Sequence, residues 1–232
     1  MKSVLITGGT VRLGKAIAER LRAEGWRVIT SSHRADAGAD IVADLAEPMG
    51  PAKLYAATLK LLNGNPPDAL VNNAALFTGD AATIGAINLE APKKLTMLMA
   101  GRETGVGAVV NILDSVILGS LGSVGSRGLT LSDFKDSKDP KSPYLASKRE
   151  LLAFTKTAAA MFAATLRVNG VAPGPVMPPT DVHEKAGEML LDRRPTPDDV
   201  AAAVSYLLGA GATTGCVISV DAGQHLLEAR RD

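Results

Sequence analysis

The stretch VLITGGTVRLG, residues 4–14, joins a short β-branched run to a glycine-rich turn and then to a segment with helical periodicity. A turn placed between a strand and a helix brings backbone N–H groups and the positive end of the helix up to a pyrophosphate. Glycine suits the turn because a Cβ would block that approach. The spacing departs from the strict G-x-G-x-x-G pattern, so an ordinary tight turn is the alternative, but the position directly after a strand favours a dinucleotide site.

Beyond this stretch, short β-branched runs alternate with segments of helical periodicity, a pattern typical of parallel strands that crossover helices bury on both faces. We expect strands at residues 4–6, 27–31, 40–42, 69–72, 108–113, 166–172 and 216–220. We expect helices at residues 15–24, 51–62, 88–100, 144–164 and 197–208. This order predicts an α/β fold, a Rossmann-type doubly wound parallel sheet of about seven strands with helices on both faces.

The last of these helices has a well-marked start, because Thr196 can cap it and Asp199 completes a capping-box-like pattern. Residues 115–143 and 174–195 fit no helix or strand, and we expect them to form loops near the active site. The chain is long enough to bury one sizeable core and contains no flexible linker, so we expect a single NAD(P)-binding domain over residues 1–232.

The composition excludes several classes of partner. Lys and Arg number 25 against 24 Asp and Glu, and their scattered distribution offers no footprint for nucleic acid or an anionic membrane. The single cysteine, Cys216, excludes an intrachain disulfide, suits a reducing compartment and is interpreted as a core residue. The apolar run at residues 4–6 is too short for a signal peptide or a membrane span. We therefore expect a soluble, unprocessed cytoplasmic protein with a small-molecule substrate and no nucleic-acid or membrane partner.

The end of the second expected strand favours NADPH over NADH. An NAD site would offer an acid to the ribose 2′-hydroxyl there, but this chain has Ser31-Ser32-His33-Arg34. The planar fork of Arg34 suits a 2′-phosphate, and Arg12 could add a second positive charge. The alternative is that either arginine is a solvated surface residue, and the nearby Asp36 weighs against the phosphate interpretation.

Two further places at the carboxyl ends of the strands are candidates for cofactor contacts. Asp44 and Leu45 follow the third expected strand and could contact the adenine. Asn73 and Ala74 end the fourth strand at the expected crevice. The alternatives are a helix cap for Asp44 and an ordinary turn for the asparagines of this region.

Four polar residues predict a catalytic site. Tyr144 and Lys148 stand four residues apart at the start of an expected helix, so both side chains rise from the same face. Alone this pair means little, because Tyr-x-x-x-Lys occurs by chance and usually marks a surface pair. Asn88 in a mid-chain helix and Asp114 at the carboxyl end of the fifth strand strengthen it, because ligands in open α/β sheets bind outside those strand ends.

A set of motifs extends over nearly the whole chain. The motifs are TGGTVRLG at 7–14, DL at 44–45, NNA at 72–74, Asn88, YLASK at 144–148, RVNGVAPGPV at 167–176 and VDAGQ at 220–224. Together they resemble the short-chain dehydrogenase/reductase family. The resemblance implies that Tyr144 is the general acid, that Lys148 holds the nicotinamide ribose and lowers the pKa of Tyr144 with its charge, and that Asn88 holds a water in a proton relay.

The same resemblance implies a cofactor site and a homotetramer in which the helices that begin near Asn88 and Tyr144 pair between subunits, and we expect no metal. The implied cofactor-binding residues are Gly8, Thr10, Arg12, Leu13, Gly14, His33, Arg34, Asp44, Leu45, Asn73, Ala74, Pro173 and Gly174.

Two residues depart from most members of the family. Asp114 stands where most have serine, and Arg12 stands where most have glycine. Together with His33-Arg34 they resemble the pteridine reductase and dihydromonapterin reductase branch. This implies NADPH-dependent hydride transfer to a pterin-type C=N bond, with Asp114 helping to protonate a ring nitrogen and Phe77 stacking on the pterin.

An acid suits a C=N substrate, because a carboxylate accepts from ring and amino N–H groups and donates when protonated, whereas serine chiefly polarises a carbonyl oxygen. Alternatives remain open: Asp114 could cap a helix or loop, and Phe77 could belong to the core. Ala75 occupies a substrate-binding position where pteridine reductases usually carry serine. Residues 115–143 are interpreted as a mobile flap over the pocket with Phe134 as a wall, and the alternative is a disordered segment without a role in the site.

The runner-up function is a carbonyl reductase acting on a ketone or aldehyde. A non-catalytic NADP-binding sensor or scaffold is the alternative of another class, since a fold does not guarantee a function.

Overall fold

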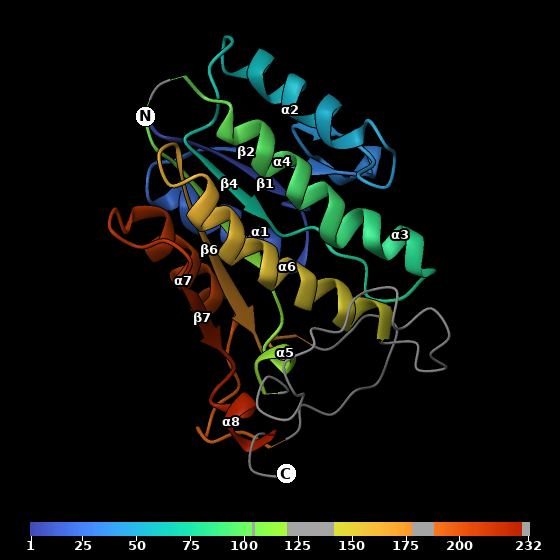
Figure 1. The fold of residues 1–232 in the computed structure, drawn as a ribbon, viewed down its shortest axis with the longest axis vertical. Coiled ribbons are helices and arrows are strands. Elements are labelled where there is room, and N and C mark those ends of the chain that lie inside the picture. The colour runs from blue at the N-terminus through green and yellow to red at the C-terminus, as the bar shows by residue number, and fades with distance from the viewer. Residues whose placement is uncertain (104, 120–141, 178–187, 229–232) are drawn as a thin grey trace.

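The computed structural model describes residues 1–103, 105–119, 142–177 and 188–228, and it contains one seven-stranded parallel sheet (Figure 1). The strands lie in the order β3-β2-β1-β4-β5-β6-β7, and every neighbouring pair is parallel. Their bounds are β1 (Ser3–Thr7), β2 (Arg27–Ser32), β3 (Ile41–Val42), β4 (Ala69–Asn72), β5 (Gly107–Ile112), β6 (Leu166–Pro173) and β7 (Val217–Val220). The predicted Rossmann-type doubly wound sheet is confirmed.

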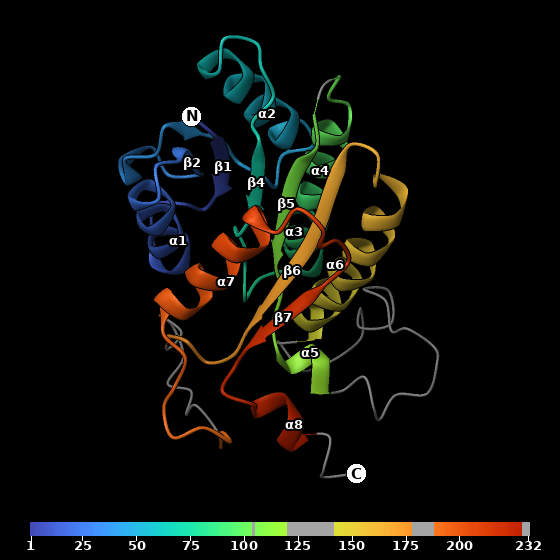
Figure 2. The same ribbon diagram turned by 90° about the vertical axis from the view of Figure 1, so that its left-hand side faces the viewer.

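Helices cover both faces of the sheet, as Figure 2 shows. The longer ones are α1 (Arg12–Ala23), α2 (Gly50–Leu61), α4 (Ala91–Ala100), α6 (Ser142–Met161) and α7 (Pro197–Gly209). The shorter ones are the 3-10 turn η1 (Ala35–Ala37), α3 (Ala81–Gly85), the π-helical turn η2 (Ala86–Glu90), α5 (Val116–Gly119) and α8 (Gln224–Glu228).

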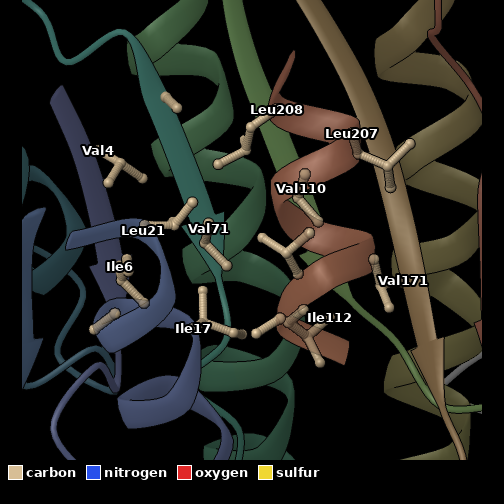
Figure 3. Packing of buried hydrophobic residues seen from close by; sticks show 14 of the residues in the cluster. Val4, Ile6, Ile17, Leu21, Val71, Val110, Ile112, Val171, Leu207 and Leu208 are labelled. Atoms are coloured by element: carbon tan, nitrogen blue, oxygen red, sulfur yellow. The ribbon is translucent and has the colours of Figure 1, made fainter. Parts of the chain in front are cut away.

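The core consists of two layers because successive residues of a strand point to opposite faces. Val4 and Ile6 pack with α1 and α7, through residues such as Ile17 and Leu207 (Figure 3). Leu5, between them in sequence, packs on the other face with residues of α2, α4 and α6. Strands buried on both faces explain the continuous apolar runs in the sequence.

The strand order reverses between β1 and β4, and this reversal positions the candidate site. The chain winds outward from β1 through β2 to β3, and then returns to build β4 to β7 on the other side of β1. The crevice beyond the carboxyl ends of the strands at such a switch point is where open α/β sheets bind ligands. The glycine-rich turn after β1 and the Asn73 turn after β4 both lie at this place.

Several boundaries differ from those expected. The mid-chain helix begins at Ala81 rather than near residue 88, because the Asp80 carboxylate accepts a hydrogen bond from the Thr83 N–H and caps an extra turn. Helix α6 ends at Met161, so the expected helix over residues 144–164 is too long at its end. The start of α7 is as expected, with Thr196 and Asp199 forming a complete capping box.

The structure describes only parts of the two segments, residues 115–143 and 174–195, that fit no predicted helix or strand. Residues 116–119 form α5, which the sequence did not indicate. Residues 174–177 and 188–195 contain no helix or strand, as expected. Phe134 and the expected flap around it lie outside the described residues.

Candidate active site

The turn between β1 and α1 has the geometry of an anion cradle. Gly8 adopts a positive φ of 62°, and a Cβ on Gly14 would collide with the Gly8 carbonyl oxygen. Val11 precedes α1 without giving it a side-chain cap, so the positive end of the helix is turned toward the strand ends as a candidate place for an anion. A dinucleotide pyrophosphate fits this cradle, and Thr10, Leu13 and Gly14 all belong to it.

Arg12 adopts a left-handed backbone conformation with φ of 49°. For a residue with a Cβ this conformation costs about 1–2 kcal/mol, which a glycine would avoid. The arginine also places a positive charge at the positive end of α1, where an anion rather than a cation is stabilised. This strained, exposed cation is a candidate for contacting an anion at the turn.

Arg34 lies in the exposed turn after β2, next to the exposed His33, and it is engaged by Asp36. The Arg34 Nε donates to Asp36 Oδ1 at 3.0 Å, and its Nη2 donates to Oδ2 at 2.7 Å. These hydrogen bonds, and the opposite charges, raise the pKa of Arg34 and lower the pKa of Asp36. Asp36, the residue that weighed against a phosphate site in the sequence, is therefore in direct contact with Arg34.

The residues expected near the adenine differ in their accessibility. Asp44 is exposed, and its Oδ1 accepts from the Ala46 N–H at 2.8 Å, so its carboxylate closes a local turn. It does not cap α2, which begins at Gly50. Leu45 is buried and belongs to the core layer beneath α2. Only Asp44 presents its side chain at the surface.

A hydrogen-bond cluster joins the carboxyl ends of β1 and β4. The Thr7 Oγ1 accepts from the N–H groups of Asn73 and Ala74, each at 3.0 Å. The Asn73 Nδ2 donates back to the carbonyls of Thr7 and Gly8 at 3.0 and 3.1 Å. Asn73 therefore shapes the glycine-rich turn directly.

The last two residues implied for cofactor contacts lie at the carboxyl end of β6, where Pro173 is its last residue and Gly174 follows it. Pro173 accepts from the Ser115 N–H at 2.9 Å, and the Gly174 N–H donates to Val220 at 3.0 Å. A Cβ on Gly174 would lie 2.6 Å from the Asp221 Cβ, so glycine is needed for this close approach. Both residues thus lie beside β5 and β7 at the carboxyl edge.

The chemical end of the site brings together three residues from separate parts of the chain. The Tyr144 hydroxyl, in the first turn of α6, donates to Asp114 Oδ2 at 2.9 Å. The ring of Phe77, which follows β4, lies 4.8 Å from the ring of Tyr144 between centroids, tilted by 60°. Asp114 Oδ1 accepts from the Val116 N–H at 3.0 Å, so this carboxylate also caps the start of α5. Ala75, by contrast, is an exposed residue of the loop after β4.

Lys148 lies one turn further along α6 and is buried. Its Nζ donates to the Ile112 carbonyl oxygen at 2.7 Å and lies 5.6 Å from the centre of the Tyr144 ring. Burial lowers the pKa of Lys148 to about 8, against the opposing effect of the Asp114 charge. This ammonium is therefore held at the carboxyl end of β5 and loses its proton more easily than an exposed lysine.

The pKa of Tyr144 is raised well above its ordinary value. The largest cause is burial of the hydroxyl, followed by the negative charge of Asp114 and the hydrogen bond to it. The lowering implied for the Lys148 charge is not among the causes of this shift, and the net direction is upward. Tyr144 remains a protonated donor over the whole neutral range.

Asn88 is buried in the π-helical turn η2, and its amide is fully engaged. Its Oδ1 accepts from the Leu76 N–H at 2.8 Å, and its Nδ2 donates to the Leu76 carbonyl at 2.9 Å and to Ser147 Oγ at 3.1 Å. Ser147 donates to the Tyr144 carbonyl at 2.6 Å. Asn88 thus ties the Phe77 loop to α6, and its role in holding a water stays a prediction.

The sequence did not indicate a buried polar chain beneath the site. Asn72 of β4 donates to Asn111 Oδ1 at 2.8 Å, and Asn111 of β5 donates to Thr155 Oγ1 of α6 at 2.9 Å. The contact locks α6 in register with the central strands. The sequence signal that could have revealed this polar chain is the asparagine inside the otherwise apolar run of β5.

Ser115, next to Asp114, is also buried, and its hydroxyl has no hydrogen-bond partner among the described residues.

The part of the chain that the structure describes contains neither a membrane-spanning helix nor a metal-binding cluster. None of its helices combines the length and apolar character needed to cross a membrane. In the same part of the chain, no three His, Cys, Asp or Glu residues are grouped so that they could hold a metal ion.

Comparisons with known proteins agree with this arrangement. Residues 12–225 match the family described as enoyl-(acyl carrier protein) reductase. A protein named as ketoacyl reductase 2 of the granaticin polyketide synthase, from Streptomyces violaceoruber, is 30% identical over 96% of each chain. FolM alternative dihydrofolate reductase 1 from Brucella canis, solved with NADP, is 29% identical over 97% of this chain and 94% of that chain, with a TM-score of 0.77. A blue fluorescent protein from a metagenomic library, solved with NADPH, is 25% identical over 96% of this chain and 97% of that chain, with a TM-score of 0.78. The chain belongs to the short-chain dehydrogenase/reductase family and is an oxidoreductase, as its motifs predict.

Proposed function

We propose that the protein is an NADPH-dependent reductase that transfers a hydride to a C=N carbon of a pterin-type substrate. The observation that carries this proposal is the hydrogen bond from Tyr144 to Asp114, formed in contact with the Phe77 ring. A phenol that donates to a carboxylate beside an aromatic face suits a flat heterocycle with several ring nitrogens.

The carboxyl edge of the sheet supplies the cofactor site in this proposal. When bound, NADPH supplies the hydride. The glycine-rich turn and the uncapped start of α1 hold the pyrophosphate, and Arg12, His33 and Arg34 provide positive or hydrogen-bonding groups for the 2′-phosphate. Lys148, fixed to the Ile112 carbonyl, is placed to hold the nicotinamide ribose. The NADP and NADPH in two of the similar structures agree with this assignment.

The proton delivered to the substrate nitrogen comes from the Tyr144 and Asp114 pair. Tyr144 carries its proton at neutral pH because its pKa is raised by burial and by the Asp114 charge. As the nitrogen gains electron density from the hydride added to the neighbouring carbon, the pair donates one proton to it, and the site regains that proton from solvent. The Asp114 carboxylate also accepts from substrate N–H groups, which a serine at this position does less well.

Phe77 adds the surface on which such a ring would lie. Its side chain is only half-buried, so one part of the ring remains available beside Tyr144. Stacking on this face would hold a planar substrate opposite the nicotinamide. The similar structure named FolM alternative dihydrofolate reductase 1 supports a substrate of this chemical class.

A carbonyl reductase is the second candidate. The relative named as a ketoacyl reductase supports it, because that name implies a keto group as the reduced centre. Tyr144 and Lys148 would serve a C=O bond equally well, with the phenol donating to the carbonyl oxygen. The two candidates differ in what they require of Asp114, which only the C=N reaction uses as a proton carrier.

The experiment that separates them follows NADPH absorbance with dihydropterins, dihydrofolate and a panel of ketones and aldehydes. The proposal expects fast oxidation of NADPH with a pterin, and a selective loss of that reaction in the Asp114→Ser variant. Fast carbonyl reduction with inert pterins would overturn the pterin assignment. If the protein binds the cofactor but turns over no substrate, and if Tyr144→Phe changes neither result, a sensor or scaffold would be favoured instead.

We also propose that the protein is a single-domain, cytoplasmic homotetramer that pairs α4 and α6 between subunits. Exposed Met97 on α4, and exposed Ala160 and Met161 on α6, support this surface. Ala158 and Ala159 do not contribute to it, because both are buried in the core of the same chain. Light scattering after size exclusion tests the proposal, and a monomer would contradict it.

A further inference from the structure

The turn after β2 is built so that Arg34 and Asp36 meet. The Arg34 N–H donates to Ser32 Oγ at 3.1 Å, and Gly38 closes the 3-10 turn η1 with a positive φ of 64°. Farther along, Asp40 Oδ2 accepts from the Thr30 N–H and hydroxyl at 2.8 and 2.7 Å. Hydrogen bonds therefore tie both ends of the turn to β2. The backbone is already fixed in the conformation that brings the side chains of Arg34 and Asp36 into contact.

The contact between them occupies two donors of the arginine at once. Arg34 donates from Nε and from Nη2 to the two oxygens of a single carboxylate, at 3.0 and 2.7 Å. An arginine binds a phosphate with the same parallel pair of N–H groups. A phosphate on the cofactor ribose that approaches this edge of the guanidinium therefore competes with the Asp36 carboxylate for the same donors.

We propose that Asp36 is an internal competitor for the 2′-phosphate of the cofactor, and that it limits how strongly this chain prefers NADPH over NADH. The proposal rests on the NADPH site of the proposed function. When Arg34 turns the Nε and Nη2 edge to a phosphate, it leaves Asp36, and the Asp36 carboxylate then remains close to a second anion. Both effects weaken the binding of a phosphorylated cofactor and leave NADH unaffected.

The exposure of the pair indicates that Asp36 tunes binding rather than blocking it. The side chains of Arg34 and Asp36 are 63% and 70% exposed. Ion pairs in such positions are weak, because water screens them and both side chains lose freedom. The turn therefore permits an exchange of partners on cofactor binding, at a modest cost.

The test measures dissociation constants by titration calorimetry for NADPH, NADH and 2′,5′-ADP, which carries the ribose phosphate without the nicotinamide. We expect Asp36→Asn to tighten NADPH and 2′,5′-ADP by roughly three- to tenfold and to change NADH by less than about twofold. In an Arg34→Ala background the same substitution should gain clearly less, because the competition for the guanidinium is then absent. Glu103→Gln is the matched control, since it removes one negative charge from an exposed position on the connection between α4 and β5.

Each outcome decides the proposal. Unchanged or weaker NADPH binding in Asp36→Asn overturns it, and so does an equal gain for NADPH and NADH, which would report net charge alone. An equal gain in the presence and absence of Arg34 also overturns it. If the unmodified protein binds neither dinucleotide, the proposed function itself fails. If the protein binds NADPH and reduces a pterin but Asp36→Asn does not change NADPH binding, only the inference about Asp36 fails.

Discussion

The Tyr144 hydroxyl donates to Asp114 Oδ2 across 2.9 Å, and this contact links the start of α6 to the end of β5. The phenol is buried, and the partner is an anion rather than another neutral hydroxyl. Both features favour the protonated phenol. The site therefore stores a proton at the position where we propose that the substrate nitrogen receives one.

Replacing Asp114 with asparagine should lower the pKa of Tyr144. The substitution removes the negative charge and the charge-assisted hydrogen bond, whereas burial still keeps the pKa above the ordinary value of tyrosine. An ultraviolet titration of tyrosinate formation measures the change, and Tyr144→Phe assigns the signal among the three tyrosines of the chain. A pKa that stays unchanged or rises in Asp114→Asn would contradict the assigned cause.

Replacing Lys148 with methionine should change how stability depends on pH. Because the folded-state pKa is about 8 and the ordinary value is 10.5, the unfolded chain binds more protons in this interval, and stability rises with pH. The cost of charging the buried amine is about 3 kcal/mol below this interval. Lys148→Met should remove most of the rise between pH 8 and 10, measured by urea unfolding. Parallel curves for the two proteins would show that the amine does not titrate in this range.

Arg12→Gly should stabilise the fold and weaken cofactor binding at the same time. Glycine relieves the left-handed strain at φ of 49°, although its greater freedom in the unfolded chain cancels part of the gain. We expect a net stabilisation of about 0.5–1 kcal/mol. Thermal unfolding measures the gain, and calorimetry should show weaker NADPH binding. A less stable variant would contradict the backbone strain at Arg12, and a variant that binds NADPH as tightly would contradict the binding role of its side chain.

Gly14→Ala should damage both the fold and the cofactor site. The added Cβ would meet the Gly8 carbonyl oxygen and the Asn73 Nδ2, so the turn must move away from β4. We expect a loss of at least about 2 kcal/mol in the free energy of unfolding, together with loss of dinucleotide binding. Gly25→Ala is the control for the loss of a glycine, since no atom lies within 4 Å of the Cβ it would add, although its φ of 84° adds backbone strain of its own. A Gly14→Ala protein that binds NADPH normally would show that the turn is not the cradle.

The sequence predicts the fold well because its strongest signals are local. The β-branched run at β1, the glycine turn and the apolar face of α1 each act over a few residues, and burial on both faces is visible in the runs themselves. The spacing of Tyr144 and Lys148 likewise fixes their common face of α6 without knowledge of the tertiary structure.

The remaining features depend on contacts between distant segments. The pKa of Tyr144 is raised by burial and by Asp114, which lies 30 residues away, so the effect of Lys148 alone could not predict the net upward shift. Asn88 is engaged by Leu76 and Ser147, and no pattern in η2 indicates those partners. The start of α3 at Ala81 was not predicted, because its only local signal is the capping residue Asp80. That signal is weak compared with the helical periodicity that begins near residue 88.

The central claim is that Tyr144 gives up the proton that accompanies hydride transfer. Single-turnover oxidation of NADPH with a dihydropterin, compared between the unmodified protein and Tyr144→Phe, tests it most directly. We expect the rate to fall by about 10²–10⁴-fold while the dissociation constant of NADPH changes little, because the phenylalanine keeps the contact with Phe77 but has no proton to donate. A single-turnover rate that is nearly unchanged would contradict the account.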